Sequence, residues 1–194
     1  MFQSLEDDKT TCETCHACEL GQTRIRSVFS GGSPYAKIMV IGEAPGKEED
    51  EQGEPFVGRS GQLLMKLFAE VGFEREKDLY ICNTIKCRPP QNRKPTLAEK
   101  EACRPFLDAQ IAFVQPKIIV LCGTTAVSSL LPHEKRTITQ IRGQWFHHTS
   151  GAKIMAVFHP SYLLRHHSLE AGKPRALMMV DLAEISRCLR LNSV

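Results

Sequence analysis

Four short apolar runs constrain the fold of this 194-residue chain more than any other feature. They cover residues 37–41, 79–85, 117–123 and 154–158, and they are rich in isoleucine, valine and leucine. Continuous apolar runs of this length are typical of strands that are covered on both faces, as they are in parallel sheets. The sequence therefore predicts four buried strands.

Helical patterns lie between these runs. Apolar residues recur at helical spacing from 63 to 71 and stop near Gly72, and Thr96 with Glu99 forms a capping box that opens a helix ending near Val114. Further helices are expected over 124–131 and 174–189, the last with apolar positions at Leu177, Val180, Leu182 and Ile185. Strands that alternate with helices predict an α/β fold, a three-layer α/β/α domain around a central, mostly parallel four-stranded sheet. We expect residues 1–194 to form a single domain.

The charge balance identifies no partner by itself. Lys and Arg number 25 against 22 Asp and Glu, which gives a net charge of +3. Basic residues do cluster locally, at Lys86, Arg88, Arg93, Lys94 and Arg104. A local basic patch can bind phosphates without a high global charge. A solvated loop with scattered charges is the alternative, and composition does not decide between the two.

The first eleven residues are polar and acidic, and they contain no apolar run of the kind found in signal peptides. No stretch approaches the ~20 apolar residues that are needed to span a bilayer. We therefore expect a cytoplasmic protein that does not contact membranes. Thiols stay reduced in that compartment, so the eight cysteines favour metal binding over disulfides.

Four of the cysteines suggest one shared metal or iron–sulfur site. Cys15 and Cys18 form a Cys-x-x-Cys pair, whereas Cys87 and Cys103 flank a basic, proline-rich stretch. Four thiolates suit an iron–sulfur cluster and also tetrahedral Zn²⁺. Cys12 extends the pair to Cys-x-x-Cys-x-x-Cys and could replace Cys15 or Cys18 as a ligand.

Polar side chains follow the predicted strands at the point where each strand ends. Glu43 follows the first strand, Asn83 lies near the end of the second, and His159 follows the fourth. Ligands of open parallel sheets bind beyond the carboxyl ends of the strands, so we expect these side chains to converge. Asn83 can match the edge of a planar base, His159 can donate to a developing negative charge, and Glu43 can orient water or stabilise a cation. Phe56 could stack on a flat ring or simply anchor its loop in the core.

Together these residues resemble the family 4 uracil-DNA glycosylases, the iron–sulfur-containing branch of that superfamily. The similarity runs from about Cys15 to Leu189 and rests on several sequence blocks in the right order. They are Gly42-Glu43-Ala44-Pro45-Gly46 with Glu49-Asp50, Pro55-Phe56-Val57-Gly58-Arg59, Asn83 with Lys86-Cys87-Arg88-Pro89-Pro90, Asn92-Arg93, Cys103-Arg104-Pro105, and His159-Pro160-Ser161-Tyr162-Leu163-Leu164-Arg165.

The resemblance implies hydrolytic removal of uracil from DNA, with the target nucleotide flipped into a pocket. It makes Glu43 and His159 catalytic, with Phe56 stacking on the base and Asn83 reading its polar edge. It implies that Gly42, Ala44 and Ser161 also bind substrate. It further implies DNA contacts by Arg59, Arg88, Arg93, Leu163, Leu164 and Arg165.

The resemblance also implies a [4Fe–4S] cluster on Cys15, Cys18, Cys87 and Cys103, with the N-terminal segment of about residues 12–20 contributing to it. Zn²⁺ is the rival metal. The expected partner is uracil-containing DNA, single- or double-stranded, and the expected state is a monomer. Two other functions are open: a non-catalytic, cluster-bearing DNA-binding module, and a nucleotide hydrolase on the same fold.

Overall fold

A computed structural model of the chain describes residues 2–166 and 168–191. In this part of the chain a six-stranded sheet has the order β1-β3-β2-β4-β6-β5. The four central strands are parallel and correspond to the four apolar runs, so those predictions are confirmed: β2 (Ile38–Gly42), β3 (Leu79–Asn83), β4 (Ile118–Cys122) and β6 (Lys153–Val157).

The expected strand number of four was too low, because two short antiparallel strands extend the edges of the sheet. β1 (Gly31–Gly32) pairs with β3, and β5 (Trp145–His147) pairs with β6. Both are two or three residues long and neither is fully buried. Such strands leave no apolar run in the sequence, which is why the pattern missed them.

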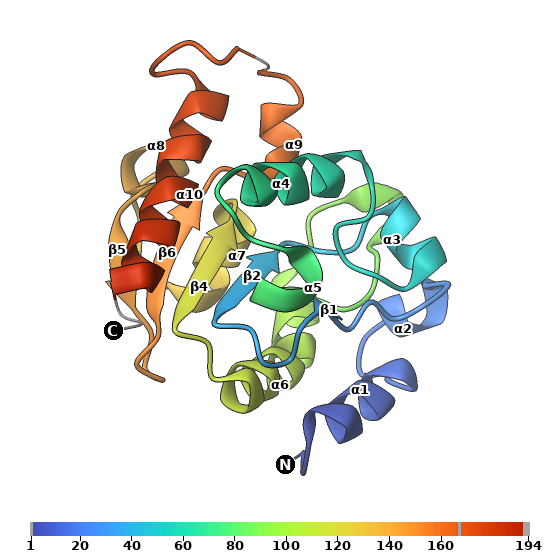
Figure 1. Ribbon diagram of the computed structural model, residues 1–194. Helices are drawn as coiled ribbons and strands as arrows, with labels where there is room; N and C mark the ends of the chain where they lie inside the picture. The colour runs from blue at the N-terminus through green and yellow to red at the C-terminus, as the bar shows by residue number, and fades with distance from the viewer. Residues whose placement is uncertain (1, 167, 192–194) are drawn as a thin grey trace.

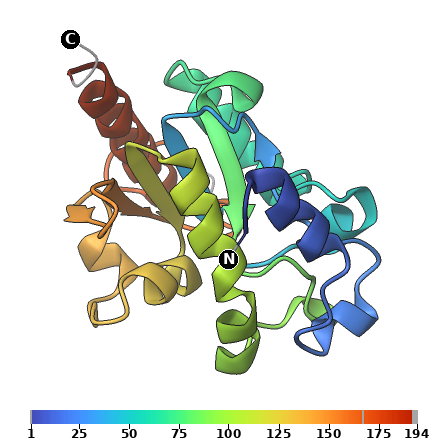
Figure 2. The same ribbon diagram turned by 90° about the horizontal axis from the view of Figure 1, so that it is seen from below.

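Helices cover both faces of the sheet and form the three layers that the sequence predicted (Figure 1). One core packs α4 (Arg59–Glu70) and α10 (Pro174–Leu191) against the sheet, and a second packs α6 (Leu97–Val114) and α7 (Thr124–Leu130) against its other face. The view from below shows α6 on one side of the strands and α10 on the other (Figure 2).

Local signals explain where the long helices begin. Thr96 Oγ1 accepts from the Glu99 N–H at 3.2 Å, and Glu99 Oε2 accepts from the Thr96 N–H at 2.8 Å, which confirms the predicted capping box of α6. Val180, one of the apolar positions named for the predicted last helix, is 62% exposed. The buried face of α10 is formed by Met178, Leu182 and Ile185. Val180 lies on a different side of the helix.

Shorter helices fill the connections, and the sequence patterns did not predict them because they are brief or polar. They are α1 (Leu5–Glu13), α2 (Leu20–Thr23), α3 (Lys47–Gln52), α5 (Arg75–Asp78), the 3-10 turn η1 (Pro90–Asn92), α8 (Ile138–Ile141) and α9 (Pro160–Leu163). α1 lies beside α6 (Figure 2). Within residues 2–166 and 168–191, no helix has both the length and the apolar character that crossing a membrane requires.

The parallel register places the functional candidates at one edge of the sheet. Gly42, the last residue of β2, is paired with Asn83, the last residue of β3. β4 ends at Cys122 opposite Val157 of β6, so the segments that follow these strands leave the sheet on the same side. Glu43 and His159 therefore emerge from strands that end at one rim.

Candidate functional site

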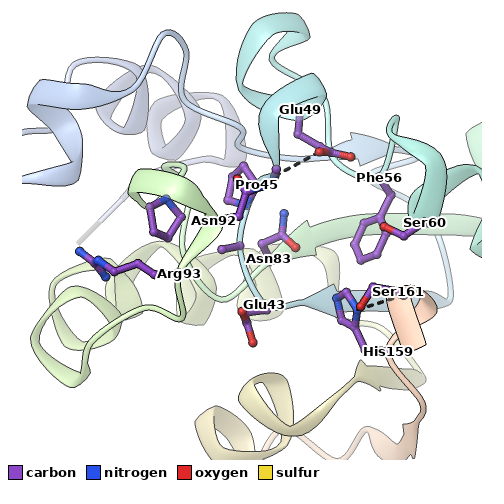
Figure 3. Close-up of a pocket in the computed structure, with 13 residues that line it drawn as sticks. Glu43, Pro45, Glu49, Phe56, Ser60, Asn83, Asn92, Arg93, His159 and Ser161 are labelled. Atoms are coloured by element: carbon purple, nitrogen blue, oxygen red, sulfur yellow. Dashed lines mark hydrogen bonds between the residues drawn. The ribbon is translucent and has the colours of Figure 1, made fainter. Parts of the chain in front are cut away.

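A pocket of about 270 Å³ lies beyond the carboxyl ends of the parallel strands. It is smaller than the ~300–1,000 Å³ that is usual for drug-sized ligands, and this suits a single flat ring. Figure 3 shows Phe56, Asn83 and His159 around one space, with Glu43 at its lower edge. Ala44 and Ser161 also line the pocket, so the structure brings most of the predicted substrate-binding residues together.

Gly42 allows Asn83 and Phe56 to meet at the base of this pocket. A Cβ on Gly42 would lie 2.4 Å from Asn83 Oδ1 and 2.5 Å from Phe56 Cζ, which is closer than real Cβ atoms come. Asn83 is 2% exposed, so its amide is held away from bulk water. The glycine thus acts by leaving room for the two side chains, and it is not itself among the residues lining the pocket.

Phe56 lies on a loop whose backbone is held by a buried carboxylate. Its φ of 56° is in the left-handed region, which is strained for a residue with a side chain. Glu49 Oε1 accepts from the Gly58 N–H at 2.8 Å, and Glu49 Oε2 accepts from the Gly46 N–H at 3.1 Å. The carboxylate therefore ties the Phe56 loop to the loop after β2. Sequence reasoning gave Glu49 no role, although its place three residues after Gly46 fits a capping position.

His159 is held as a neutral imidazole with a defined tautomer. The Ser161 N–H donates to its Nδ1 at 3.2 Å, and Ser161 Oγ lies 2.7 Å from the same nitrogen. Because the main-chain N–H can only donate, Nδ1 is an acceptor and the ring proton is on Nε2. Desolvation lowers the pKa of His159, and the nearby Glu43 opposes this only in part. The ring therefore offers one N–H donor at neutral pH.

Glu43 is held at both its main chain and its side chain. Its carbonyl oxygen accepts from Thr84 Oγ1 at 2.6 Å. Its Oε2 accepts a short hydrogen bond from Thr125 Oγ1. Thr125 was not predicted, because it belongs to no motif block. The signal that could have found it is its position three residues after the end of a strand whose neighbours carry Glu43 and His159.

Fewer of the clustered basic residues reach the surface than their sequence positions suggest. Lys86 is 1% exposed, and its Nζ donates to Asn83 O at 2.8 Å and to Gln110 Oε1 at 2.6 Å. It therefore cannot contact phosphate, and its inclusion in the patch was wrong. The charge of a lysine suggests a surface position, but the ammonium group of Lys86 makes its hydrogen bonds inside the core.

The arginines of the loop between β3 and α6 are also held by neighbours. Arg93 makes a two-armed ion pair with Glu99, at 2.9 and 2.6 Å, and its side chain points away from the pocket (Figure 3). The same pair lowers the pKa of Glu99 to about 2. Arg88 Nε donates to Asn92 Oδ1 at 2.7 Å. Arg93 is exposed and lines the pocket, whereas Arg88 is half-buried.

The segment after His159 divides into a buried part and an exposed part. Leu163, the last residue of α9, is fully buried in the core that contains α4, so its side chain presents no surface to DNA in this structure. Leu164 is half-buried and Arg165 is exposed. Arg165 and Lys94 line a second cavity that shares Glu43, His159 and Ser161 with the pocket. Arg59 is exposed at the start of α4.

The predicted ligand cysteines come together at a second place. A small cavity is lined by Cys12, Cys15, Cys18, Cys87 and Cys103, so the fifth thiol lies with the four predicted ligands. Among the residues that the structure describes, no three His, Cys, Asp or Glu side chains are already grouped closely enough to hold a metal ion. Cys82 and Cys122 are buried in the strands, and Cys188 is buried on α10.

The donors around these thiols suit a sulfur that carries negative charge. Arg24 Nη1 donates to Cys87 Sγ at 3.0 Å, and the Lys86 N–H donates to Cys103 Sγ at 3.3 Å. Burial raises the pKa of Cys103 to about 11. Desolvation alone would thus keep such a thiol neutral, whereas bound iron or zinc would hold it as the thiolate. The set of donors fits a cysteine-ligated metal group.

Comparisons with known proteins agree with this arrangement. The family model for the uracil DNA glycosylase superfamily matches residues 29–183. A Type-4 uracil-DNA glycosylase of Thermotoga maritima is 48% identical over 168 residues, 87% of this chain and 85% of the relative. Those of Archaeoglobus fulgidus and Sulfurisphaera tokodaii are 38% and 40% identical, each over 84% of this chain, and the matches cover 84% and 77% of the relatives. This chain belongs to the uracil DNA glycosylase superfamily.

Proposed function

We propose that this protein is an enzyme that removes uracil from DNA by hydrolysing its N-glycosidic bond and leaving an abasic site. The observation that carries the proposal is the convergence of Phe56, Asn83, His159 and Glu43 on one ring-sized pocket. Membership of the superfamily and the similarity to Type-4 enzymes support it. A module that only binds DNA would not need all four side chains in one place.

The pocket can recognise a base that has been flipped out of the stack. Flipping costs a few kcal/mol, which contacts inside the pocket must offset. The Phe56 ring would stack on the base, while the Asn83 amide supplies one donor and one acceptor to its polar edge. The same amide matches cytosine poorly, because cytosine presents a donor where uracil presents an acceptor. Selection for uracil follows from this mismatch.

The chemistry follows from the charges that develop as the bond breaks. Uracil leaves as an anion, and the Nε2–H of neutral His159 would donate to the oxygen on which that charge gathers. The sugar becomes cation-like, and the Glu43 carboxylate is placed to orient the attacking water or to stabilise this cation. Water supplies the hydroxyl that bonds to the sugar and the proton that ends on the uracil anion, so the reaction is a hydrolysis and both side chains are regenerated.

The cysteine-lined cavity would hold the [4Fe–4S] cluster on Cys15, Cys18, Cys87 and Cys103. When bound, the cluster supplies structural cross-linking: it joins the segment before α2 to the loop after β3 and to α6. Arg24 would hydrogen-bond to a ligand sulfur, which is a common way to stabilise a thiolate ligand. Arg88 follows Cys87 directly, so fixing Cys87 also fixes the start of the basic loop.

The DNA would lie across the rim of the pocket, where Arg59, Arg88, Arg93, Leu164 and Arg165 are at or near the surface. Phosphate contacts of this kind set position and carry no sequence information. Both single and double strands can present a flipped uracil to such a rim. A single-domain monomer is sufficient to excise one base. We expect the protein to act in the cytoplasm.

The function is tested with a labelled oligonucleotide that carries a single uracil. After incubation and alkali treatment, which breaks the strand at abasic sites, we expect cleavage at the uracil. A matched oligonucleotide with thymine should stay intact. If cluster-loaded protein binds the uracil strand and never cleaves it, the non-catalytic binding module is the better description.

The cluster has its own test. Cys87→Ser is expected to lose most of the iron and the absorption near the blue, because one of four ligands is gone. The unfolding midpoint should fall by more than about 5 °C, since the cluster joins three parts of the chain. Cys188→Ser is the control and should keep its iron. If the wild-type protein is colourless and contains zinc, the four cysteines hold Zn²⁺ and not an iron–sulfur cluster.

A further inference from the structure

The turn between β4 and α7 touches both of the proposed catalytic side chains. Thr125, in the first turn of α7, donates its hydroxyl hydrogen to Glu43 Oε2. Gly123, two residues earlier, lies against His159, and a Cβ there would come within 2.9 Å of His159 Cβ. One short segment therefore contacts both Glu43 and His159, the two side chains that the proposed reaction uses.

The direction of the Thr125 hydrogen bond is fixed by chemistry. An ionised carboxylate only accepts, so the hydroxyl hydrogen of Thr125 must point towards Glu43. Thr125 is 8% exposed, and water therefore competes weakly for this bond. The bond occupies Oε2 and leaves Oε1 of the same carboxylate for the substrate.

Thr125 is itself anchored. Its carbonyl oxygen accepts from Ser128 Oγ and from Ser129 Oγ, both at 3.0 Å. On the other side, the Thr84 hydroxyl holds the main chain of Glu43. Thr84, the residue after β3, thus holds the carbonyl group of Glu43, and Thr125 of α7 holds its carboxylate.

A glutamate without such a bond would sample several rotamers, and only some of these would aim an oxygen at the sugar. Rate depends steeply on this aim, because reacting groups must lie within a few tenths of an ångström of the productive geometry. A residue that selects one rotamer can therefore affect turnover without touching the substrate.

We propose that Thr125 is a positioning residue, which fixes the Glu43 carboxylate relative to His159 and so determines the rate of bond cleavage. This inference rests on the proposed function and deepens it. It assigns a role to a side chain that no sequence block of the resemblance contains.

The test compares Thr125→Val, which keeps the shape and removes the hydroxyl, with Thr125→Ser, which keeps the hydroxyl. Thr125→Val should lower kcat about tenfold, as expected for one hydrogen bond to a charged group, and leave KM unchanged. Thr125→Ser should recover most of the rate. Thr149→Val is the matched control, because it makes the same substitution at an exposed position that does not line the pocket, and it should behave as wild type.

A double-mutant cycle separates positioning from general damage to the fold. In a Glu43→Ala background, Thr125→Val should cause no further loss, since no carboxylate remains to be positioned. An equal loss in both backgrounds, or wild-type kcat for Thr125→Val, would overturn the inference. Absence of uracil release by the wild type would instead refute the proposed function, so the two failures are distinguishable.

Discussion

Replacing His159 with alanine is expected to slow uracil release about a hundredfold, because one well-aimed donor to a developing anion contributes ~3 kcal/mol. Nδ1 accepts from the Ser161 N–H, which leaves Nε2–H as the donor that the neutral ring can offer. Binding of DNA should change little, because the bond strengthens only as charge develops. The measurement is the single-turnover rate on a uracil oligonucleotide, with affinity measured in parallel.

The chain supplies a matched control for this experiment. His148 has the same local pattern, in which the Ser150 N–H donates to its Nδ1 at 3.2 Å and Ser150 Oγ lies 2.8 Å away. It lies in the turn between β5 and β6 and does not line the pocket. His148→Ala should retain the full rate. If both variants lost the same activity, the effect would come from the fold and not from a donor to uracil.

Replacing Asn83 with alanine should also lower the rate about a hundredfold, since two hydrogen bonds of ~1.5 kcal/mol each are lost. Asn83→Asp is the sharper variant, because it keeps the size and loses the donor. A carboxylate would face the uracil oxygen without a hydrogen between them, whereas it could accept from the amino group of cytosine. The ratio of uracil to cytosine release should therefore fall in Asn83→Asp.

Comparison of uracil, cytosine and thymine oligonucleotides measures this selectivity directly. Gln144→Ala removes an exposed amide elsewhere and serves as the control. Unchanged thermal midpoints would show that the variants remain folded. Full activity of Asn83→Ala on uracil would remove Asn83 from base recognition, and the pocket would then have to select by shape.

Sequence patterns predicted the strands and helices for which the local sequence and the tertiary packing favour the same structure. The apolar runs became the four parallel strands, and the Thr96–Glu99 box begins α6. The sequence patterns predicted less well whether an individual side chain points into the core or towards solvent. Leu163 reads like an exposed loop residue but turns into the core, and Lys86 reads like a phosphate ligand but is buried beneath Asn83.

The functional site likewise contains side chains that the sequence predicted and others that it did not. The strand-end rule predicted which side chains meet, because register fixes where parallel strands end. It did not predict the residues that hold them, since Thr125 and Glu49 act through hydrogen bonds to residues that are distant in the sequence or on another loop. A buried lysine and a buried threonine look in sequence like any surface residue. Only the assembled fold distinguishes them.

The contact between α1 and α6, together with the shared cysteine cavity, has a consequence for the order of events during synthesis. The segment with Cys15 and Cys18 leaves the ribosome early, but its packing partner exists only once Cys103 and the rest of α6 have followed. Non-local contacts of this kind form late. Until then these thiols are exposed to oxidants and to metal ions that their packing partner would otherwise keep away.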